Sequence, residues 1–110
     1  ILILGLTFKE NCPDLRNTKS IEIFNQLSKY CKTIDLVDPI ASKEEAKELY
    51  GVKILKEIPF NKKYSAILVL VAHNYFKKIT LEEWQNLLDS NSVIFDIKGI
   101  VNKDLAPIRI

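Results

Sequence analysis

Residues 66–72 have the sequence AILVLVA, an apolar run bounded by Ser65 and His73. Successive side chains of a β-strand point to opposite sides of the sheet, so a strand that is apolar throughout is covered on both faces. Such strands are typical of parallel sheets with helices on both sides. The run therefore predicts the central strand of an α/β domain.

Further strands are predicted on both sides of this run, at residues 1–4, 33–37, 52–55 and 92–97. Each is short and rich in leucine or β-branched residues, as strands usually are. The first is closed by Gly5. The second is stopped by Asp38-Pro39, because proline cannot donate a hydrogen bond to a ladder.

Helical patterns separate the strands. One helix is indicated by apolar residues at three- and four-residue steps, namely Ile21, Phe24, Leu27 and Cys31. Asn17 or Thr18 is placed to cap it. Two capping boxes, Ser42 to Glu45 and Thr80 to Glu83, open further helices, and Gly51 is suited to a left-handed end of the first.

The alternation of strands and helices predicts a parallel sheet with right-handed crossovers. We expect one α/β domain over residues 1–110, with a Rossmann-like, doubly wound sheet of about five strands and helices on both faces. The expected strand order is 3-2-1-4-5, which reverses between the first and fourth strands.

The composition narrows the function. A net charge of +2 and scattered basic residues argue against a nucleic-acid surface. Cys12 and Cys31 fit neither a metal site nor a disulfide framework, which favours a reduced cytoplasmic setting. No apolar run is long enough to cross a membrane. The chain contains no methionine and opens inside a strand-like run, so we expect it to be a piece of a longer protein.

Ligands of such sheets bind beyond the carboxyl ends of the strands, where the strand order reverses. That rule brings together two loops, residues 6–17 and 73–78. The polar side chains available there and at the end of the fifth strand are Lys9, Arg16, His73, Asn74 and Lys98. A lysine and an arginine near a helix start suit a diphosphate.

Each candidate also has an ordinary interpretation. Lys9 and Arg16 fit simple loop charges, and His73 is more typical of a packed, hydrogen-bonded structural histidine than of a base. Cys12 lies near cations but has no partner histidine in sequence, which argues against a nucleophile. Asp38 stands where dinucleotide-binding domains place a ribose-binding carboxylate. The G-x-G-x-x-G turn is absent, which argues against a primary NAD site here.

Residues 5–18, GLTFKENCPDLRNT, resemble the opening of the UDP-binding domain in the UDP-glucose/GDP-mannose dehydrogenase family. The family pattern is G-x-x-F-K, an acidic stretch, then D-x-R and a helix. Three further matches follow in the family's order: Val37-Asp38-Pro39, His73-x-x-Phe76 and Asp96-x-Lys98. The resemblance covers essentially the whole chain, and its variant is most similar to the subgroup acting on UDP-N-acetylhexosamines in Vi-type capsule pathways.

The resemblance implies a UDP-sugar-binding C-terminal domain of an NAD-dependent UDP-sugar 6-dehydrogenase, which serves surface polysaccharide biosynthesis. Members of the family add an N-terminal NAD-binding domain and a central dimerisation region, so the parent is expected to be a homo-oligomer. They oxidise C6 of the sugar to the acid with NAD, through a cysteine-bound thiohemiacetal.

The same resemblance assigns individual residues. Lys9 and Lys98 match positions that contact the UDP-sugar, although the family usually has arginine where Lys98 stands. Arg16 matches the arginine on the NAD side. The catalytic cysteine lies upstream and Cys12 does not match it, so the chain is expected to hold no catalytic residue and no metal, and to be inactive alone.

Two non-enzymatic alternatives are weighed against this interpretation. A receiver-type signalling module shares the α/β alternation, but it needs an acidic pair after the first strand and a phosphorylatable aspartate after the third, where this chain has Gly5-Leu6 and Lys56-Glu57. A purely structural or assembly domain is the other alternative. The presence of both Lys9 and Arg16 argues against a structural domain. A nucleotide-binding test distinguishes it from a UDP-binding domain.

Overall fold

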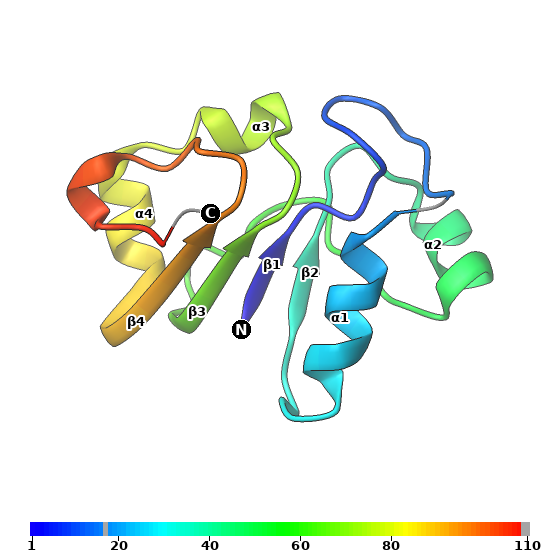
Figure 1. Ribbon diagram of the computed structural model, residues 1–110, viewed down its shortest axis with the longest axis horizontal. Coiled ribbons are helices and arrows are strands. Elements are labelled where there is room, and N and C mark those ends of the chain that lie inside the picture. Colours follow the sequence, from blue (N-terminus) through cyan, green and yellow to red (C-terminus); the bar gives the residue numbers. More distant parts are fainter. Residues whose placement is uncertain (17, 109–110) are drawn as a thin grey trace.

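The computed structural model describes residues 1–16 and 18–108. Its sheet has four parallel strands: β1 (Leu2–Leu4), β2 (Asp35–Val37), β3 (Tyr64–Val69) and β4 (Leu88–Asp96). The strand order is β2-β1-β3-β4, with Leu4 level with Val37 on one side and Val69 on the other (Figure 1). All four strands point the same way, so their carboxyl ends share one edge of the sheet. The predicted α/β fold is confirmed.

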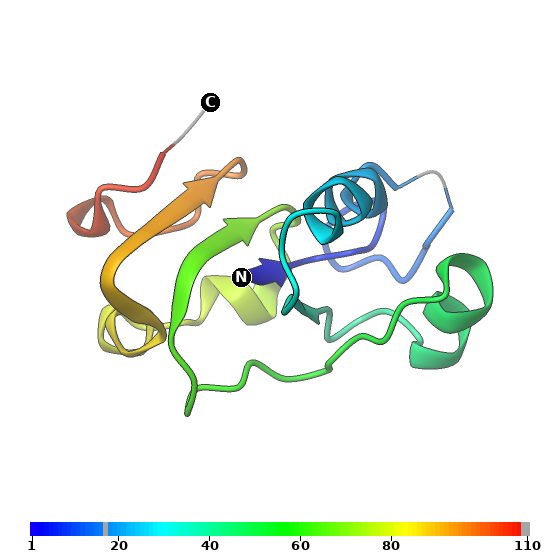
Figure 2. The same ribbon diagram turned by 90° about the horizontal axis from the view of Figure 1, so that it is seen from below.

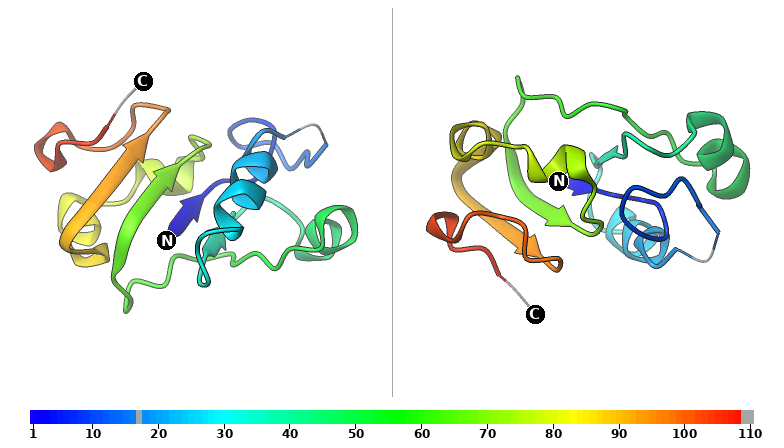
Figure 3. Two further views of the ribbon diagram at one scale, coloured as in Figure 1. Left: turned by 60° about the horizontal axis from the view of Figure 1, so that its bottom comes forward. Right: turned by 90° about the horizontal axis from the view of Figure 1, so that it is seen from above.

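Helices cover both faces of this sheet, as predicted. In chain order the helices are α1 (Ser20–Ser28), α2 (Lys43–Tyr50), α3 (Asn74–Lys77), α4 (Leu81–Leu87) and the 3-10 helix η1 (Lys103–Leu105). Figures 2 and 3 show α1 and α4 on opposite sides of the sheet.

The alternation of side chains along β1 divides the core into two halves. Leu2 and Leu4 join a cluster with Trp84 of α4, whereas Ile3 joins a second cluster with Ile21 of α1. The three β1 side chains are fully buried. A strand covered in this way must be apolar at every position, which is the pattern that the sequence shows.

The predicted strand at residues 52–55 is not a strand. Only Leu55 pairs, through an isolated parallel bridge to Val37 at the outer edge of β2. Leu55 donates to the carbonyl oxygen of Leu36 and accepts the amide hydrogen of Asp38, whereas residues 52–54, which this register places level with residues 34–36, form no ladder with β2. The expected order 3-2-1-4-5 is nevertheless kept, with the third strand reduced to this one bridge.

The first helix starts later than the sequence predicts. Its N-cap is Lys19, which makes no side-chain capping bond, and Thr18 instead accepts the amide hydrogen of Ser20 at 3.1 Å. Asn17, the other predicted cap, lies outside the described residues. The helix ends at Ser28, so Cys31 follows it rather than lying on its apolar face.

The other two predicted helix starts are largely confirmed. Thr80 and Glu83 form a complete capping box at α4. Ser42 accepts the amide hydrogen of Glu45, but its hydroxyl donates to the carboxylate of Glu44. Helix α2 ends at Gly51 with φ of 67°, the left-handed C-terminal cap that the sequence predicts.

Candidate functional site

Two loops meet at the carboxyl edge of the sheet, as the strand order predicts. The loop of residues 6–16 follows β1, and residues 70–74 follow β3 and lead into α3 (Figure 1). The amide groups of Leu70 and Val71 both donate to the carbonyl oxygen of Leu4. The chain therefore leaves β1 and β3 side by side. The loop of residues 6–16 and residues 70–74 begin next to each other at the carboxyl edge of the sheet.

Gly5 makes the exit from β1 possible. Its φ is +107°, and a Cβ atom at this position would lie 2.5 Å from Cβ of Val71 and 2.8 Å from the Val71 nitrogen. A larger residue has no room there, and L-residues rarely adopt this backbone conformation. Only glycine lets the loop of residues 6–16 turn so tightly over the end of β3.

Asp38, at the end of β2, is fully buried and fully hydrogen-bonded. At 2.7 to 3.1 Å its carboxylate accepts the amide hydrogens of Leu6, Thr7, Ile40 and Ala41, and it contacts Nε2 of His73. Burial alone would raise the pKa of Asp38, but the hydrogen bonds from His73 and the backbone lower it to about 2. Both carboxylate oxygens are used inside the chain, so Asp38 organises the loops rather than facing a ribose.

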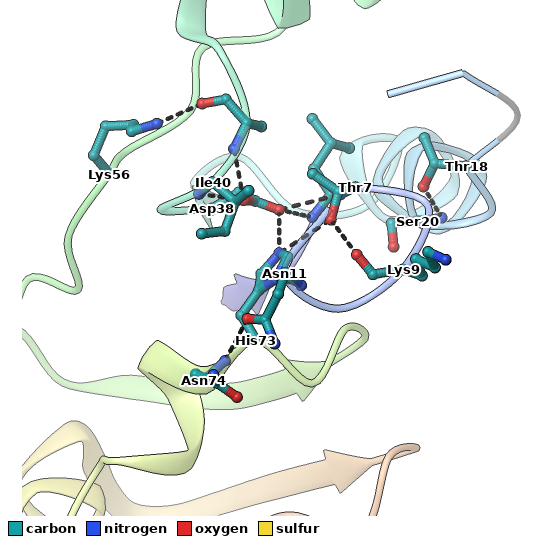
Figure 4. Close-up of polar contacts among 12 residues, drawn as sticks. Thr7, Lys9, Asn11, Thr18, Ser20, Asp38, Ile40, Lys56, His73 and Asn74 are labelled. Carbon is teal, nitrogen blue, oxygen red and sulfur yellow. Dashed lines mark hydrogen bonds and ion pairs between the residues drawn. The ribbon is translucent and has the colours of Figure 1, made fainter. Parts of the chain in front are cut away.

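His73 is completely buried between these loops, with both ring nitrogens engaged (Figure 4). Nδ1 accepts the amide hydrogen of Asn11 at 2.8 Å, so the geometry assigns the ring proton to Nε2. Nε2 lies 3.0 Å from both the Asp38 carboxylate and the Thr7 hydroxyl. The predicted packed, hydrogen-bonded histidine is confirmed.

Asn11 was not singled out from the sequence, yet it joins the two loops. Its amide donates to His73, and its side-chain Oδ1 accepts the amide hydrogen of Asn74 at 2.9 Å (Figure 4). Its φ is 58°, a left-handed conformation that asparagine tolerates better than most residues. An asparagine in a loop after a strand was the available signal, although it did not indicate the partner.

Lys9 lies between these anchors on the exposed side of the loop. Its backbone carbonyl accepts the Thr7 hydroxyl hydrogen at 3.1 Å. Within residues 1–16 and 18–108, the Lys9 ammonium makes no hydrogen bond or ion pair, whereas the backbone around it is fixed. The neighbouring residue Phe8 is also 58% exposed, so the loop presents a cation beside an apolar residue.

Arg16 is paired within its own loop. Its guanidinium binds both carboxylate oxygens of Asp14, with Nε at 3.0 Å and Nη2 at 3.2 Å. This pairing raises the pKa of Arg16 and lowers that of Asp14. The Arg16 side chain remains 80% exposed. The negative charge of Glu45, in the first turn of α2, also contributes to the raised pKa of Arg16. Its neighbour Leu15 accepts a hydrogen bond from the Tyr50 hydroxyl of α2, so Arg16 stands on the α2 side of the loop.

Lys98 lies in an exposed turn after β4, before Gly99 with φ of +71°. The turn is shaped by Asp96, which is fully buried and accepts the amide hydrogens of Ile100 and Val101 at 3.1 and 2.8 Å. Because β3 separates β1 from β4, the turn follows a strand that is two strands away from the one that leads into the Lys9 loop. The structure thus brings Lys9, His73 and Asn74 together, and places Lys98 further along the same edge.

The arrangement suits anion binding better than covalent chemistry. Cys12 is half-buried, and the chain's one histidine has both ring nitrogens engaged, so Cys12 has no imidazole to activate it.

In the part of the chain that the structure describes, no three His, Cys, Asp or Glu side chains are grouped to hold a metal ion. No described helix is long and apolar enough to cross a membrane.

The structure does not support the receiver alternative at the two positions where a receiver needs its acidic pair and its phosphorylatable aspartate. Gly5 and Leu6 follow β1, and Lys56 follows the bridge at Leu55, where its ammonium donates to the carbonyl oxygen of Ala41. An exposed aspartate that could be phosphorylated is missing from these two positions.

Comparison with known sequences gives a consistent match. A family model described as UDP-glucose/GDP-mannose dehydrogenase family, UDP binding domain, matches residues 2–103. The UDP-N-acetyl-D-glucosamine 6-dehydrogenase of Pseudomonas aeruginosa is 38% identical over 110 residues, which is 100% of this chain and 26% of that protein. Protein CapL of Staphylococcus aureus is 41% identical over 104 residues, 93% of this chain and 24% of that protein.

Solved structures show the same fold. The UDP-D-ManNAc dehydrogenase of Pyrococcus horikoshii superposes with a TM-score of 0.75 at 18% identity, over 99% of this chain and 24% of that one. The UDP-N-acetyl-mannosamine dehydrogenase Cap5O of Staphylococcus aureus gives 0.74 at 21% identity, over 98% and 25%. The chain spans about a quarter of the length of the relatives it matches.

Proposed function

The chain belongs to the UDP-glucose/GDP-mannose dehydrogenase family as its UDP-binding domain, and from this premise we propose that its carboxyl edge binds the diphosphate of a UDP-sugar. The observation that carries the proposal is the Lys9 ammonium, exposed and unpaired within the described residues, on a loop fixed by buried Asp38 and His73. A cation held on a preorganised loop binds an anion without first ordering the backbone. A charge-assisted bond to a phosphate oxygen is among the stronger polar contacts.

Lys98 is proposed as the second contact to the UDP moiety. It lies on the same edge of the sheet, in the turn after β4, and a ligand as long as a nucleotide sugar can extend along that edge. The family usually has arginine at this position. A lysine ammonium is a point charge, whereas the arginine guanidinium is planar and can bind two oxygens at once. The contact therefore loses its bidentate geometry but remains positively charged.

Arg16 is proposed to face NAD rather than the UDP-sugar. Its guanidinium is largely exposed and stands on the α2 side of the loop, away from the turn that carries Lys98. Its pairing with Asp14 holds the side chain in one direction. The cofactor itself would be held mainly by an NAD-binding region upstream in the parent chain.

The parent is proposed to be an NAD-dependent UDP-sugar 6-dehydrogenase of the cytoplasm that makes an acidic sugar for surface polysaccharide. Support for a UDP-N-acetylhexosamine substrate comes from the relatives, since the match from Pseudomonas aeruginosa is named for UDP-N-acetyl-D-glucosamine. The partners would be the NAD-binding and dimerisation regions of the same chain, in a homo-oligomer. This domain would bind and orient the sugar nucleotide, and the nucleophile would come from elsewhere.

Calorimetric titration tests the binding proposal. We expect the full-length enzyme to bind UDP, and to bind uridine far more weakly because uridine lacks the diphosphate. A panel of UDP-hexoses and UDP-N-acetylhexosamines, assayed for NAD reduction, then identifies the sugar. Equal affinity for UDP and uridine would contradict a diphosphate site at this edge.

A further inference from the structure

We propose that His73 is a positioning residue for Lys9: one buried imidazole fixes the loop backbone on both sides of the lysine. The proposal rests on the UDP-binding role of Lys9 described above. It assigns His73 a part in substrate affinity without contact to the substrate.

The contacts of the ring place Lys9 between two anchors. On the amino side, Nε2 of His73 lies 3.0 Å from the Thr7 hydroxyl, which itself donates to the carbonyl oxygen of Lys9 at 3.1 Å. On the carboxyl side, Nδ1 accepts the amide hydrogen of Asn11 at 2.8 Å. The loop is therefore tied to one ring two residues before Lys9 and two residues after it.

The ring can serve as a fixed reference because it is itself held firmly. It is fully buried, lies 3.0 Å from the Asp38 carboxylate, and packs against Phe76 with ring centroids 5.5 Å apart. His73 also occupies the N-cap position of α3, a few residues after the end of β3, although its side chain makes no capping bond. His73, which follows β3, therefore fixes the backbone on both sides of Lys9 relative to the sheet.

Two isosteric substitutions separate the two functions of the ring. In His73→Gln, the amide nitrogen can replace Nε2 as donor to Asp38 and Thr7, but the acceptor for Asn11 is lost. In His73→Asn, the side-chain oxygen can replace Nδ1 as acceptor for Asn11, and the Thr7 hydroxyl still donates to the Lys9 carbonyl, but Nε2 is lost to both Thr7 and the buried Asp38 carboxylate. The first substitution loosens the Lys9 loop, and the second mainly destabilises the domain.

Steady-state kinetics of the full-length enzyme test the proposal. We expect His73→Gln to raise the KM for the UDP-sugar roughly 5- to 10-fold, with kcat and the KM for NAD nearly unchanged. We expect His73→Asn to lower the melting temperature more than it lowers turnover. Leu87→Ala is the matched control, because it opens a cavity in the core at α4 and should lower the melting temperature without changing this KM.

A double-mutant cycle shows whether the effect passes through Lys9. If it does, His73→Gln should add little to the KM once Lys9→Ala is present, so the two changes should be strongly non-additive. Should His73→Gln fail to fold, Thr7→Val removes the hydroxyl between the imidazole and the Lys9 carbonyl. That variant loosens the amino side of the Lys9 loop, so it should also raise the KM for the UDP-sugar, and it should be non-additive with Lys9→Ala.

The outcomes distinguish failure of this proposal from failure of the proposed function. If Lys9→Ala raises the KM but a folded His73→Gln leaves it unchanged, the positioning role is wrong and UDP binding stands. Full additivity of the two substitutions also overturns the positioning role. If Lys9→Ala leaves the KM unchanged as well, the UDP-binding role of Lys9 itself fails.

Discussion

The side-chain oxygen of Asn11 accepts the amide hydrogen of Asn74 at 2.9 Å, although 63 positions separate the two residues in the chain. With the bond from the Asn11 amide to His73, this contact fastens the tip of the first loop to the start of α3. Lys9 lies on the fastened loop, so the stability of this junction and the affinity for ligand should be measurable separately.

Substitution of Asn11 should reveal two separate contributions. Asn11→Gly keeps the left-handed backbone but loses the bond to Asn74, which should cost about 1 kcal/mol. Asn11→Ala loses the same bond and also places an alanine at φ of 58°, which should cost about 2 kcal/mol in total. Urea unfolding measures both, and equal losses for the two variants would show that the backbone is unstrained.

The stability of the domain should fall in acid because of Asp38. Folding lowers the pKa of Asp38 from 3.8 to about 2, so its stabilisation is complete above pH 4 and is lost as the pH falls towards 2. The amount is about 2 kcal/mol at 1.4 kcal/mol per pKa unit. Chemical unfolding of the native chain and of Asp38→Asn, from pH 2 to 7, should show a gap that narrows below pH 4. A constant gap would mean that Asp38 does not titrate in this range.

Gly5→Ala should destabilise the domain far more than Gly51→Ala. Both glycines have positive φ, but a Cβ atom at position 5 would collide with Val71, whereas at position 51 nothing lies within 4 Å. We expect roughly 3–5 kcal/mol for Gly5→Ala, from strain and collision together. Gly51→Ala should cost only about 1 kcal/mol. Thermal or urea unfolding of the pair provides the comparison.

Lys9→Ala and Arg16→Ala should weaken different ligands in the intact enzyme. Lys9→Ala should weaken UDP-sugar binding roughly 10- to 150-fold, the range for one charge-assisted hydrogen bond, and leave NAD affinity nearly unchanged. Arg16→Ala should act mainly on NAD, because Arg16 matches the family's arginine on the NAD side of the cleft. Kinetics with each ligand varied in turn measure the two effects. Loss of one and the same ligand in both variants would favour a single shared anion site.

The 110-residue chain alone should reduce no NAD with any UDP-sugar. Its one histidine is buried with both ring nitrogens engaged, and neither cysteine has an imidazole partner among the described residues. Absorbance of NADH at high protein concentration is a sufficient assay, and the full-length enzyme serves as positive control. Turnover by the isolated chain would show that it contains a nucleophile that the structure does not indicate.

Much of the fold could be predicted because local chemistry and long-range packing agree. The apolar run at residues 66–72, the capping box at Thr80 and the glycine at position 51 each specify a structure from neighbouring residues alone. The strand predicted at 52–55 was wrong because a strand also needs a partner, and only Leu55 pairs with β2, which the local pattern of residues does not indicate.

The candidate site was predicted in its location but not in its construction. The reversal of strand order brings the loops together, and the side chain of His73 was correctly interpreted as structural. The roles of Asn11 and Asp38 depend on amide groups that lie 31 to 63 positions away, and no sequence spacing indicates such partners. The roles of Lys9, Arg16 and Lys98 remain predictions, since they involve ligands.

The partners of the Lys9 loop have a consequence for synthesis on the ribosome. The loop leaves the ribosome before the residues that hold it, because its ties run to Asp38, His73 and Asn74, which are translated 31 to 63 positions later. Until residue 74 has left the exit tunnel, the nascent loop lacks the groups that hold it. The first residues of the binding edge to be translated are therefore among the last to reach their native geometry, and translation pauses before this point should prolong their exposure to proteases and chaperones.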